Sequence, residues 1–135
     1  MRATLVDSNV IIDYLDSDSE WSTWSAAMLA EAADHGAVAI NPIIYAEVSV
    51  VYPAVEDVED ALPQNYFLRA HLPWEAAFLA GKCFERYRRR GGARRSPLPD
   101  FYIGAHAAVA GYRLLTRDAT RYRTYFPRLE LISPG

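Results

Sequence analysis

The sequence predicts an α/β protein in which helices cover both faces of a central, mainly parallel sheet. Two observations lead to this prediction. Short apolar runs bounded by polar or turn residues alternate along the chain with longer segments whose apolar residues recur at helical spacing. Strands that alternate with helices in this way pair in parallel and are covered on both sides. The 135 residues contain no internal repeat and no long linker, so we expect a single domain over residues 1–135.

The individual elements follow from these patterns. The expected strands are the short apolar runs, and they cover residues 3–6, 37–40, 66–72, 113–116 and 129–132. The expected helices are the segments with three- and four-residue apolar spacing, and they cover residues 8–15, 21–35, 42–51, 55–62, 73–90, 99–111 and 119–125.

Capping and breaking residues support several helix ends. Ser8 is the expected cap of the first helix, and Gly36 ends the second. Pro73 and Pro99 each stand at a first helical turn, where a proline costs no hydrogen bond. The helix that begins at Pro73 carries an apolar stripe that we expect to face the core, made of Trp74, Ala77, Phe78, Gly81 and Phe84.

Composition excludes several classes of protein. Apolar residues make up 51% of the chain and charged residues 23%, which is ordinary for a folded domain and excludes intrinsic disorder as the main description. The single cysteine, Cys83, forms no internal disulfide and no thiol metal site, and we expect it to pack as a small hydrophobe. No apolar run reaches the roughly 20 residues that a membrane helix needs, and the N-terminus has no signal-peptide core. We therefore expect a cytoplasmic protein with no membrane partner.

Charge is distributed unevenly along the chain. Residues 1–81 contain thirteen acidic and two basic residues, a net charge of −11, whereas residues 82–135 contain twelve basic and four acidic residues, a net charge of +8. Arginines are concentrated before and after the Gly91-Gly92 pair. Arginine suits phosphate contact because its planar group binds two oxygens at once. The alternative is a solvated helix end whose cations are favoured by the helix dipole.

Four acidic residues stand where the local pattern favours an apolar or a turn residue. Asp7 and Asp118 each follow a predicted strand, and the carboxyl ends of parallel strands lie along one edge of a sheet, where ligands bind. Glu47 has apolar neighbours three and four positions away, so it does not lie on a solvated helix face. Asp100 lies in the first turn of the helix that Pro99 opens. Taken singly, each has an ordinary alternative as a helix cap, a turn residue or a salt-bridge partner.

Together the four acids indicate a divalent metal site. Carboxylates about 4 Å apart repel one another by roughly 4 kcal/mol at an effective dielectric constant near 20, so a cluster of four needs a counter-charge. Carboxylate oxygens and water are the ligands that Mg²⁺ and Mn²⁺ prefer, and such ions promote attack on a phosphodiester. An acidic metal site beside arginines is typical of a nuclease.

Four sequence motifs carry a resemblance to a known family. They are LVDSNVIIDYL, IIYAEV, PDFYIGAHA and LLTRD, and their order and spacing resemble the PIN domain over residues 4–134. Within that family the chain is most similar to VapC, the ribonuclease toxin of bacterial and archaeal type II toxin–antitoxin modules. The resemblance implies a three-layer α/β/α fold.

The resemblance also implies a site and its chemistry. The catalytic and metal-binding residues match the acidic quartet of the family, and they are Asp7, Glu47, Asp100 and Asp118. Asn9 and Thr116 match polar positions beside the quartet, and with Ser8 they are expected to support it. The implied cofactor is Mg²⁺ or Mn²⁺. The implied reaction is hydrolysis of structured RNA such as tRNA, rRNA or mRNA by metal-activated water, leaving a 5′-phosphate and a 3′-hydroxyl. Thr120 replaces a further acid that some relatives carry, so only one ion is expected to be held firmly.

Binding partners are expected on the same basis. The family implies a homodimer and a VapB-type antitoxin whose C-terminal segment blocks the site. The residues expected to hold the RNA backbone are Arg86, Arg88, Arg89, Arg90, Arg94 and Arg95. Tyr102 or Tyr122 could stack on unpaired bases. Asp13, on the helix that contains the second half of the first motif, is expected on a solvated helix face, and His106 is expected to be a packing residue.

Other functions are compatible with parts of the pattern. A phosphatase with Asp7 as nucleophile would need a second acid two residues later and a lysine at the phosphate, but Asn9 stands at that position and the only lysine, Lys82, has a different setting. A PIN-domain nuclease of RNA processing without an antitoxin remains open. So does a PIN domain that binds RNA without cleaving it.

Overall fold

The computed structural model describes residues 2–134. Within them, five strands form one sheet in the order β3-β2-β1-β4-β5, and each neighbouring pair runs parallel. The expected parallel α/β architecture is confirmed. The strands are β1 (Thr4–Val6), β2 (Val38–Ile40), β3 (Phe67–Arg69), β4 (Arg113–Leu115) and β5 (Leu131–Ile132).

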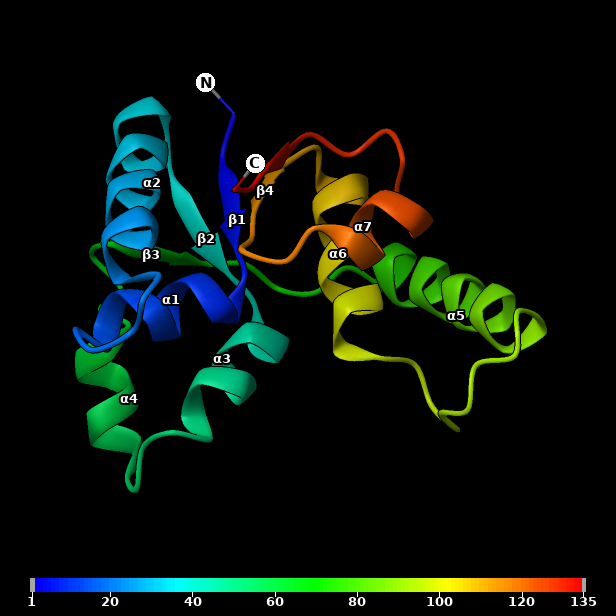
Figure 1. The fold of residues 1–135 in the computed structure, drawn as a ribbon, viewed down its shortest axis with the longest axis horizontal. Coiled ribbons are helices and arrows are strands. Elements are labelled where there is room, and N and C mark those ends of the chain that lie inside the picture. Colours follow the sequence, from blue (N-terminus) through cyan, green and yellow to red (C-terminus); the bar gives the residue numbers. More distant parts are fainter. Residues whose placement is uncertain (1, 135) are drawn as a thin grey trace.

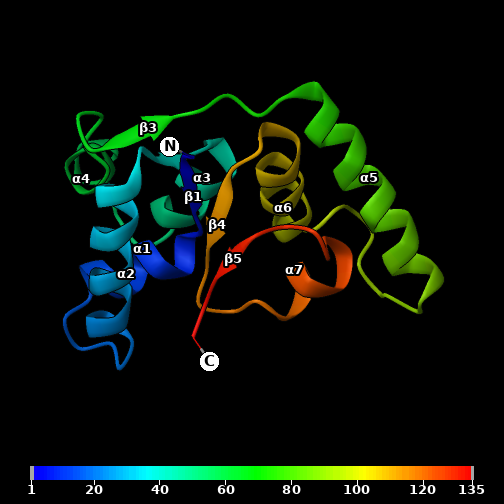
Figure 2. The ribbon, with the colours of Figure 1, turned by 90° about the horizontal axis from the view of Figure 1, so that it is seen from above.

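Seven helices connect these strands in residues 2–134. They are α1 (Ser8–Leu15), α2 (Ser22–His35), α3 (Pro42–Ser49), α4 (Val55–Ala61), α5 (Trp74–Arg89), α6 (Pro99–Ala110) and α7 (Thr120–Tyr125). Figures 1 and 2 show α1 and α2 on one side of the sheet and α5, α6 and α7 on the other, which gives three layers. None of the helices in the described part of the chain is long and apolar enough to cross a membrane.

The core explains why the strands are short apolar runs without alternation. Leu5, Val6, Leu114 and Leu115 have no exposed surface, because helices cover both faces of the two central strands. Phe126, at the end of α7, packs directly on Gly104 of α6. A Cβ atom at Gly104 would lie 2.4 Å from a ring carbon of Phe126, so a larger residue there would displace the ring.

The structure corrects three local expectations. The cap of α1 is Asp7 rather than Ser8, since the Asp7 carboxylate accepts a hydrogen bond from the Ser8 N–H and the helix begins at Ser8. The third strand covers only Phe67–Arg69 of the expected 66–72.

The third correction concerns α5, which buries a different face from the one expected. Trp74 and Phe78 are 88% and 68% exposed. The buried face is a stripe of small residues that allows close packing on α6, and it consists of Ala76, Ala80 and Cys83. The burial of Cys83 and of His106, whose Nδ1 lies 3.0 Å from Asn41 Nδ2, confirms both as packing residues.

Candidate metal centre

The sheet brings Asp7 and Asp118 to one edge because β1 and β4 are neighbours. The Asp7 N–H donates to the Leu115 carbonyl at 2.9 Å, so Asp7 stands directly after the last paired residues of β1 and β4. The Thr116 hydroxyl lies between the two acids: it donates to Asp7 Oδ2 at 2.8 Å and accepts from the Asp118 N–H at 3.2 Å. The expected convergence of the two strand ends is confirmed.

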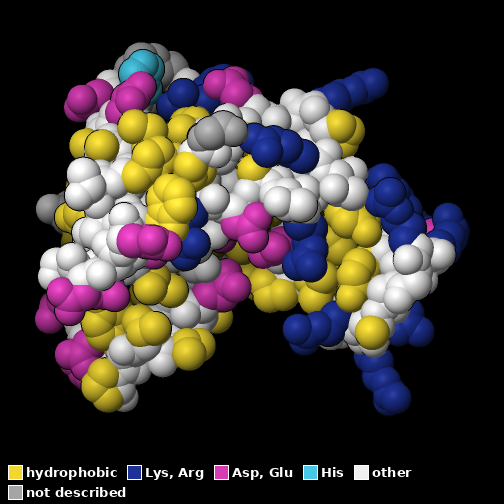
Figure 3. Space-filling model, in the orientation of Figure 1, with side chains coloured by type: hydrophobic (Ala, Val, Ile, Leu, Met, Phe, Trp, Pro, Cys, Tyr) yellow, Lys and Arg dark blue, Asp and Glu magenta, His cyan; other side chains and the backbone are white. Residues whose placement is uncertain are grey.

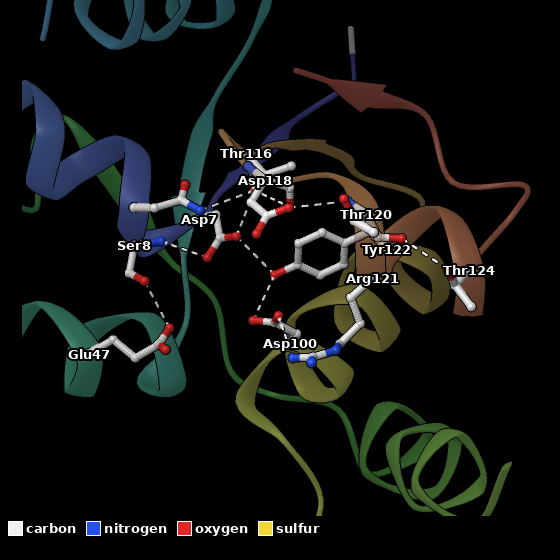
Figure 4. Close-up of polar contacts among 11 residues, drawn as sticks. Asp7, Ser8, Glu47, Asp100, Thr116, Asp118, Thr120, Arg121, Tyr122 and Thr124 are labelled. Atoms are coloured by element: carbon white, nitrogen blue, oxygen red, sulfur yellow. Dashed lines mark hydrogen bonds and ion pairs between the residues drawn. The ribbon is translucent and has the colours of Figure 1, made fainter. Parts of the chain in front are cut away.

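Two helices bring Glu47 and Asp100 to the same edge. Glu47 on α3 accepts a hydrogen bond from the Ser8 hydroxyl at 2.9 Å, and the Ser8 N–H donates to Asp7 at 2.8 Å. Asp100 lies in the first turn of α6 and shares one contact with Asp7, the Tyr122 hydroxyl. Figure 4 shows the four carboxylates around one space between α3 and α6. All four predicted acids, and Ser8 and Thr116 as their supports, therefore surround one site.

Burial makes the charged forms of three of these acids unfavourable. Asp7 is 4% exposed, and burial raises its pKa from 3.8 to about 6, although hydrogen bonds from Thr116 and Tyr122 lower it. The charges of Asp100 and Glu47 raise it further. Burial likewise raises the pKa of Glu47 and of Asp100, against a hydrogen bond from Ser8 in the first case and the charge of Arg121 in the second. A buried set of acids that repel one another is stabilised by a bound cation.

Two residues of the site were not predicted from the sequence. The Tyr122 hydroxyl on α7 lies 2.9 Å from Asp7 Oδ2 and 3.4 Å from Asp100 Oδ1, and its single proton serves one carboxylate at a time. Tyr122 is 1% exposed, so the expectation that it stacks on RNA bases is wrong. The second is Arg121, whose guanidinium lies 3.3 Å from Asp100 Oδ2. No local pattern marked either residue, because their partners are distant in sequence.

A polar network from α1 fixes the segment that carries Asp118. The Asn9 side chain accepts from the Arg117 N–H at 3.1 Å and lies 3.4 Å from the Thr116 hydroxyl, so it lies beside the residue that contacts Asp7. The Arg117 side chain donates to Asp13 Oδ2 at 2.5 Å. Asp13 is 6% exposed, so the solvated position expected for it is wrong. A buried carboxylate needs a cationic partner, and here that partner is 104 residues away in the sequence.

The six arginines expected to bind RNA lie in one stretch of surface, from the last turns of α5 into the following loop. All are exposed. Arg89 pairs with Glu85 at 2.8 Å, and Arg88 donates to the Arg94 carbonyl. In Figure 3, Lys and Arg side chains gather on the right, over α5 and α7, while acidic side chains lie on the left and in the centre. The acidic and basic parts of the sequence are therefore also separated on the surface of the folded protein.

The donor set fits a hard divalent cation. Carboxylate and hydroxyl oxygens surround the site, and neither a thiol nor an imidazole contacts the four acids in residues 2–134. No three His, Cys, Asp or Glu side chains among these residues are already gathered at metal-ligand distance. Binding of an ion would therefore draw the carboxylates together, and Asp118, which is exposed, and Asp100, which is part-buried, have room to move.

Comparison with known families identifies the family to which this fold belongs. The family model described as the PIN domain matches residues 4–127. The chain belongs to the PIN domain family. The expected family is thereby confirmed, and the three-layer α/β/α architecture is the one that this family has. No curated protein matches the sequence.

Solved structures show the same fold at low sequence identity. VapBC2 from Rickettsia felis, bound to a promoter DNA fragment, matches with a TM-score of 0.72 at 16% identity, over 98% of this chain and 99% of that chain. VapBC-1 from nontypeable Haemophilus influenzae matches with a TM-score of 0.72 at 16% identity, over 97% of each chain. A toxin–antitoxin complex from Klebsiella pneumoniae matches with a TM-score of 0.66 at 21% identity, over 98% of each chain. The PIN domain of this chain thus has the fold of these proteins over nearly its whole length.

Tyr122→Phe tests whether the phenol supports the Asp7 carboxylate. The variant removes one of three donors to a buried anion, so we expect a loss of about 1–3 kcal/mol in the free energy of unfolding at pH 8. At pH 4.5, below the Asp7 pKa of about 6, the acid is protonated in the folded protein and the loss becomes smaller. Urea denaturation at both pH values measures it, with Tyr125→Phe on the same helix as control. An equal loss at both pH values would show that the hydroxyl does not act through the charge of Asp7.

Proposed function

We propose that this PIN domain is the toxin of a type II toxin–antitoxin module and acts as a Mg²⁺- or Mn²⁺-dependent endoribonuclease on structured RNA. The observation that carries the proposal is the meeting of Asp7, Glu47, Asp100 and Asp118 around one space at the carboxyl edge of the sheet. The arginines at the end of α5 lie on the same side of the molecule as α7, which contacts this site. A metal-dependent nuclease needs both an acidic site and a basic surface for its substrate.

The four carboxylates would hold the ion, and Ser8, Thr116 and Asn9 would keep them in place. When bound, a divalent ion supplies positive charge that stabilises the transition state of phosphodiester hydrolysis and makes an attacking water more acidic. Burial raises the pKa of Asp7 and Asp100 most, and the charges of neighbouring acids raise it further, so a bound cation would favour the charged form of both carboxylates.

Glu47 and Arg121 would act on the substrate itself. Glu47 is half-buried with a raised pKa, which suits a group that orients the attacking water and accepts its proton. Attack of that water on phosphorus breaks the bond to the 3′ oxygen, leaving a 5′-phosphate on one fragment and, once the oxygen has taken up a proton, a 3′-hydroxyl on the other. Arg121 pairs with Asp100 through a side chain that is 43% exposed, so its guanidinium can turn to a phosphate oxygen.

The proposed partners follow from the structures that share the fold. Those structures contain VapBC or toxin–antitoxin complexes, which supports a VapB-type antitoxin as the partner of this chain. We further propose a homodimer and a cytoplasmic site of action, where tRNA, rRNA and mRNA are present. The acidic surface of residues 1–81 offers a complementary charge to a basic antitoxin segment.

Expression in a bacterial host tests the proposal. Induction of the wild-type chain should stop growth and produce RNA fragments with new 5′-phosphate ends at a small number of positions, and Asp118→Asn should do neither. End mapping of total RNA before and after induction gives both the activity and the target. Growth arrest with intact RNA, or the same fragments from the variant, would contradict the proposed activity. Fragments without growth arrest would favour a nuclease of RNA processing.

A further inference from the structure

A hollow of about 270 Å³ lies between α5 and α7, outside the acidic site. Its lining comprises Arg86, Arg89 and Arg90 of α5 and Thr124 of α7. In Figure 4, Thr124 lies beyond Tyr122, on the far side from Asp7. Three cations that face one hollow are a binding environment for an anion.

Two of these arginines are held against one aromatic ring. The guanidinium carbons of Arg86 and Arg90 lie 5.3 and 5.8 Å from the centre of the Tyr125 ring. Tyr125 in turn packs edge-on against Phe101, with ring centres 4.9 Å apart, and Phe101 is fully buried. The ring is therefore anchored to the core, and it orders two cations on its surface.

The charges of Arg86 and Arg90 are not neutralised by the protein. Within residues 2–134, the ion pairs join other cations, such as Arg89 with Glu85, and no carboxylate lies within 4.0 Å of the Arg86 or Arg90 side-chain nitrogens. Like charges four residues apart on a helix are unfavourable. The dipole of α5 explains why cations are tolerated at its C-terminal end, but not why two of them converge on one ring.

The hollow and the acidic site share the helix α7. Arg121 and Tyr122 contact Asp100 and Asp7, and Thr124 and Tyr125 stand one helical turn further along. One turn of helix advances by about 5.4 Å. The hollow therefore lies about one helical turn along α7 from the residues that contact the acidic site, which is the scale on which a strand with one phosphate at that site could reach it.

We propose that Arg86 and Arg90, ordered on Tyr125, bind a backbone phosphate of the RNA strand next to the one that is cleaved. This inference rests on the proposed ribonuclease function and adds to it a fixed place for the flanking strand. The site reads a phosphate charge and no base, so it sets the position of the strand and the minimum length of a substrate rather than its sequence.

The test uses the double variant Arg86→Gln/Arg90→Gln on the Asp100→Asn background, which keeps the RNA intact. The matched control is Arg123→Gln/Arg128→Gln, which makes the same change in charge at two exposed arginines that form no ion pair with a carboxylate in residues 2–134. The probe is a single-stranded RNA oligonucleotide, and the readout is its affinity at several salt concentrations. Each phosphate contact contributes about 0.7 to the slope of log affinity against log salt, so loss of one contact in the double variant should lower the slope by about 0.7 and the control should not.

A scan of neutral linkages then locates the phosphate. RNA oligonucleotides with one methylphosphonate at successive positions should bind the Asp100→Asn protein several-fold more weakly at one flanking position. When Arg86→Gln/Arg90→Gln is added to Asp100→Asn, a methylphosphonate at that position should no longer weaken RNA binding. A slope and a scan equal to those of the control would overturn the inference. Poly-glutamate is a second probe of the same proteins. If the double variant loses binding of poly-glutamate and keeps its RNA affinity, the inference is also overturned, because the hollow would then bind an acidic protein.

The two proposals fail in distinguishable ways. If wild-type protein leaves RNA intact with either metal but the double variant still loses the salt slope and the sensitive position, the ribonuclease function is wrong and the phosphate site stands as part of an RNA-binding surface. If wild-type protein cleaves RNA and the double variant behaves like the control, only the phosphate site is wrong. Circular dichroism of each variant confirms that the fold is retained.

Discussion

Asp100→Asn should lower RNA cleavage in vitro by about 100-fold or more, since loss of even an outer partner of a metal ligand costs about 10–100-fold. Asparagine keeps the size of the side chain but removes the charge that an ion would require. Asp100 is also the candidate ligand that Arg121 and Tyr122 contact, so the substitution changes the contacts of both residues. Cleavage of purified RNA in Mg²⁺, in Mn²⁺ and in EDTA measures the effect, and wild-type activity should disappear in EDTA.

Glu75→Gln is the matched control for this variant. Glu75 stands in the first turn of α5 as Asp100 stands in the first turn of α6, so both substitutions remove the same favourable helix-dipole interaction. Glu75 is exposed, outside the acidic site. Full activity of Asp100→Asn, or an equal loss in Glu75→Gln, would remove Asp100 from the proposed site.

Asp7→Asn should make the protein more stable and inactive. The pKa of Asp7 is about 6 in the folded protein against 3.8 for the ordinary group. The folded state therefore binds the proton more tightly, so stability falls as pH rises through this interval and stays low above it. At about 1.4 kcal/mol per pKa unit, the buried charge costs about 3 kcal/mol at pH 8 without a metal ion. Asparagine removes the charge and gives up part of the hydrogen bonding, which leaves an expected gain of about 1–3 kcal/mol.

Thermal denaturation in EDTA at pH 8 and at pH 4.5 measures this gain. The midpoint of Asp7→Asn should exceed that of the wild type by several degrees at pH 8, and the difference should shrink at pH 4.5, where folded Asp7 is protonated. Asp18→Asn, an exposed acid beyond the end of α1, is the control and should show no such pH dependence. A variant less stable than the wild type at pH 8 would show that the three hydrogen bonds outweigh burial of the charge.

The sequence was sufficient to predict the sheet and the position of its acids. Strands buried on both faces are apolar without alternation, so their positions were visible in the sequence, although β3 and β5 are shorter than expected. The all-parallel order then placed Asp7 and Asp118 at one edge. Glu47 and Asp100 came from the combination of local pattern and family resemblance. These features depend on short segments, which sequence patterns describe well.

Features that depend on distant partners were not predictable in this way. Asp13 has the spacing of a solvated residue, but Arg117 pairs with it from the other half of the chain. Tyr122 has an unremarkable place in a short helix, and its role arises from Asp7 and Asp100. On α5, the large residues Trp74 and Phe78 suggested the wrong buried face, because close packing on α6 selects small side chains instead.

The central claim is that Asp7, Glu47, Asp100 and Asp118 form one divalent cation site, and calorimetric titration with Mn²⁺ tests it most directly. Wild-type protein and Glu75→Gln should bind Mn²⁺ saturably and release it to EDTA. Asp100→Asn should bind at least about 10-fold more weakly, because it lacks one charged ligand. Absence of saturable binding to the wild type, or equal affinity in Asp100→Asn, would contradict the account.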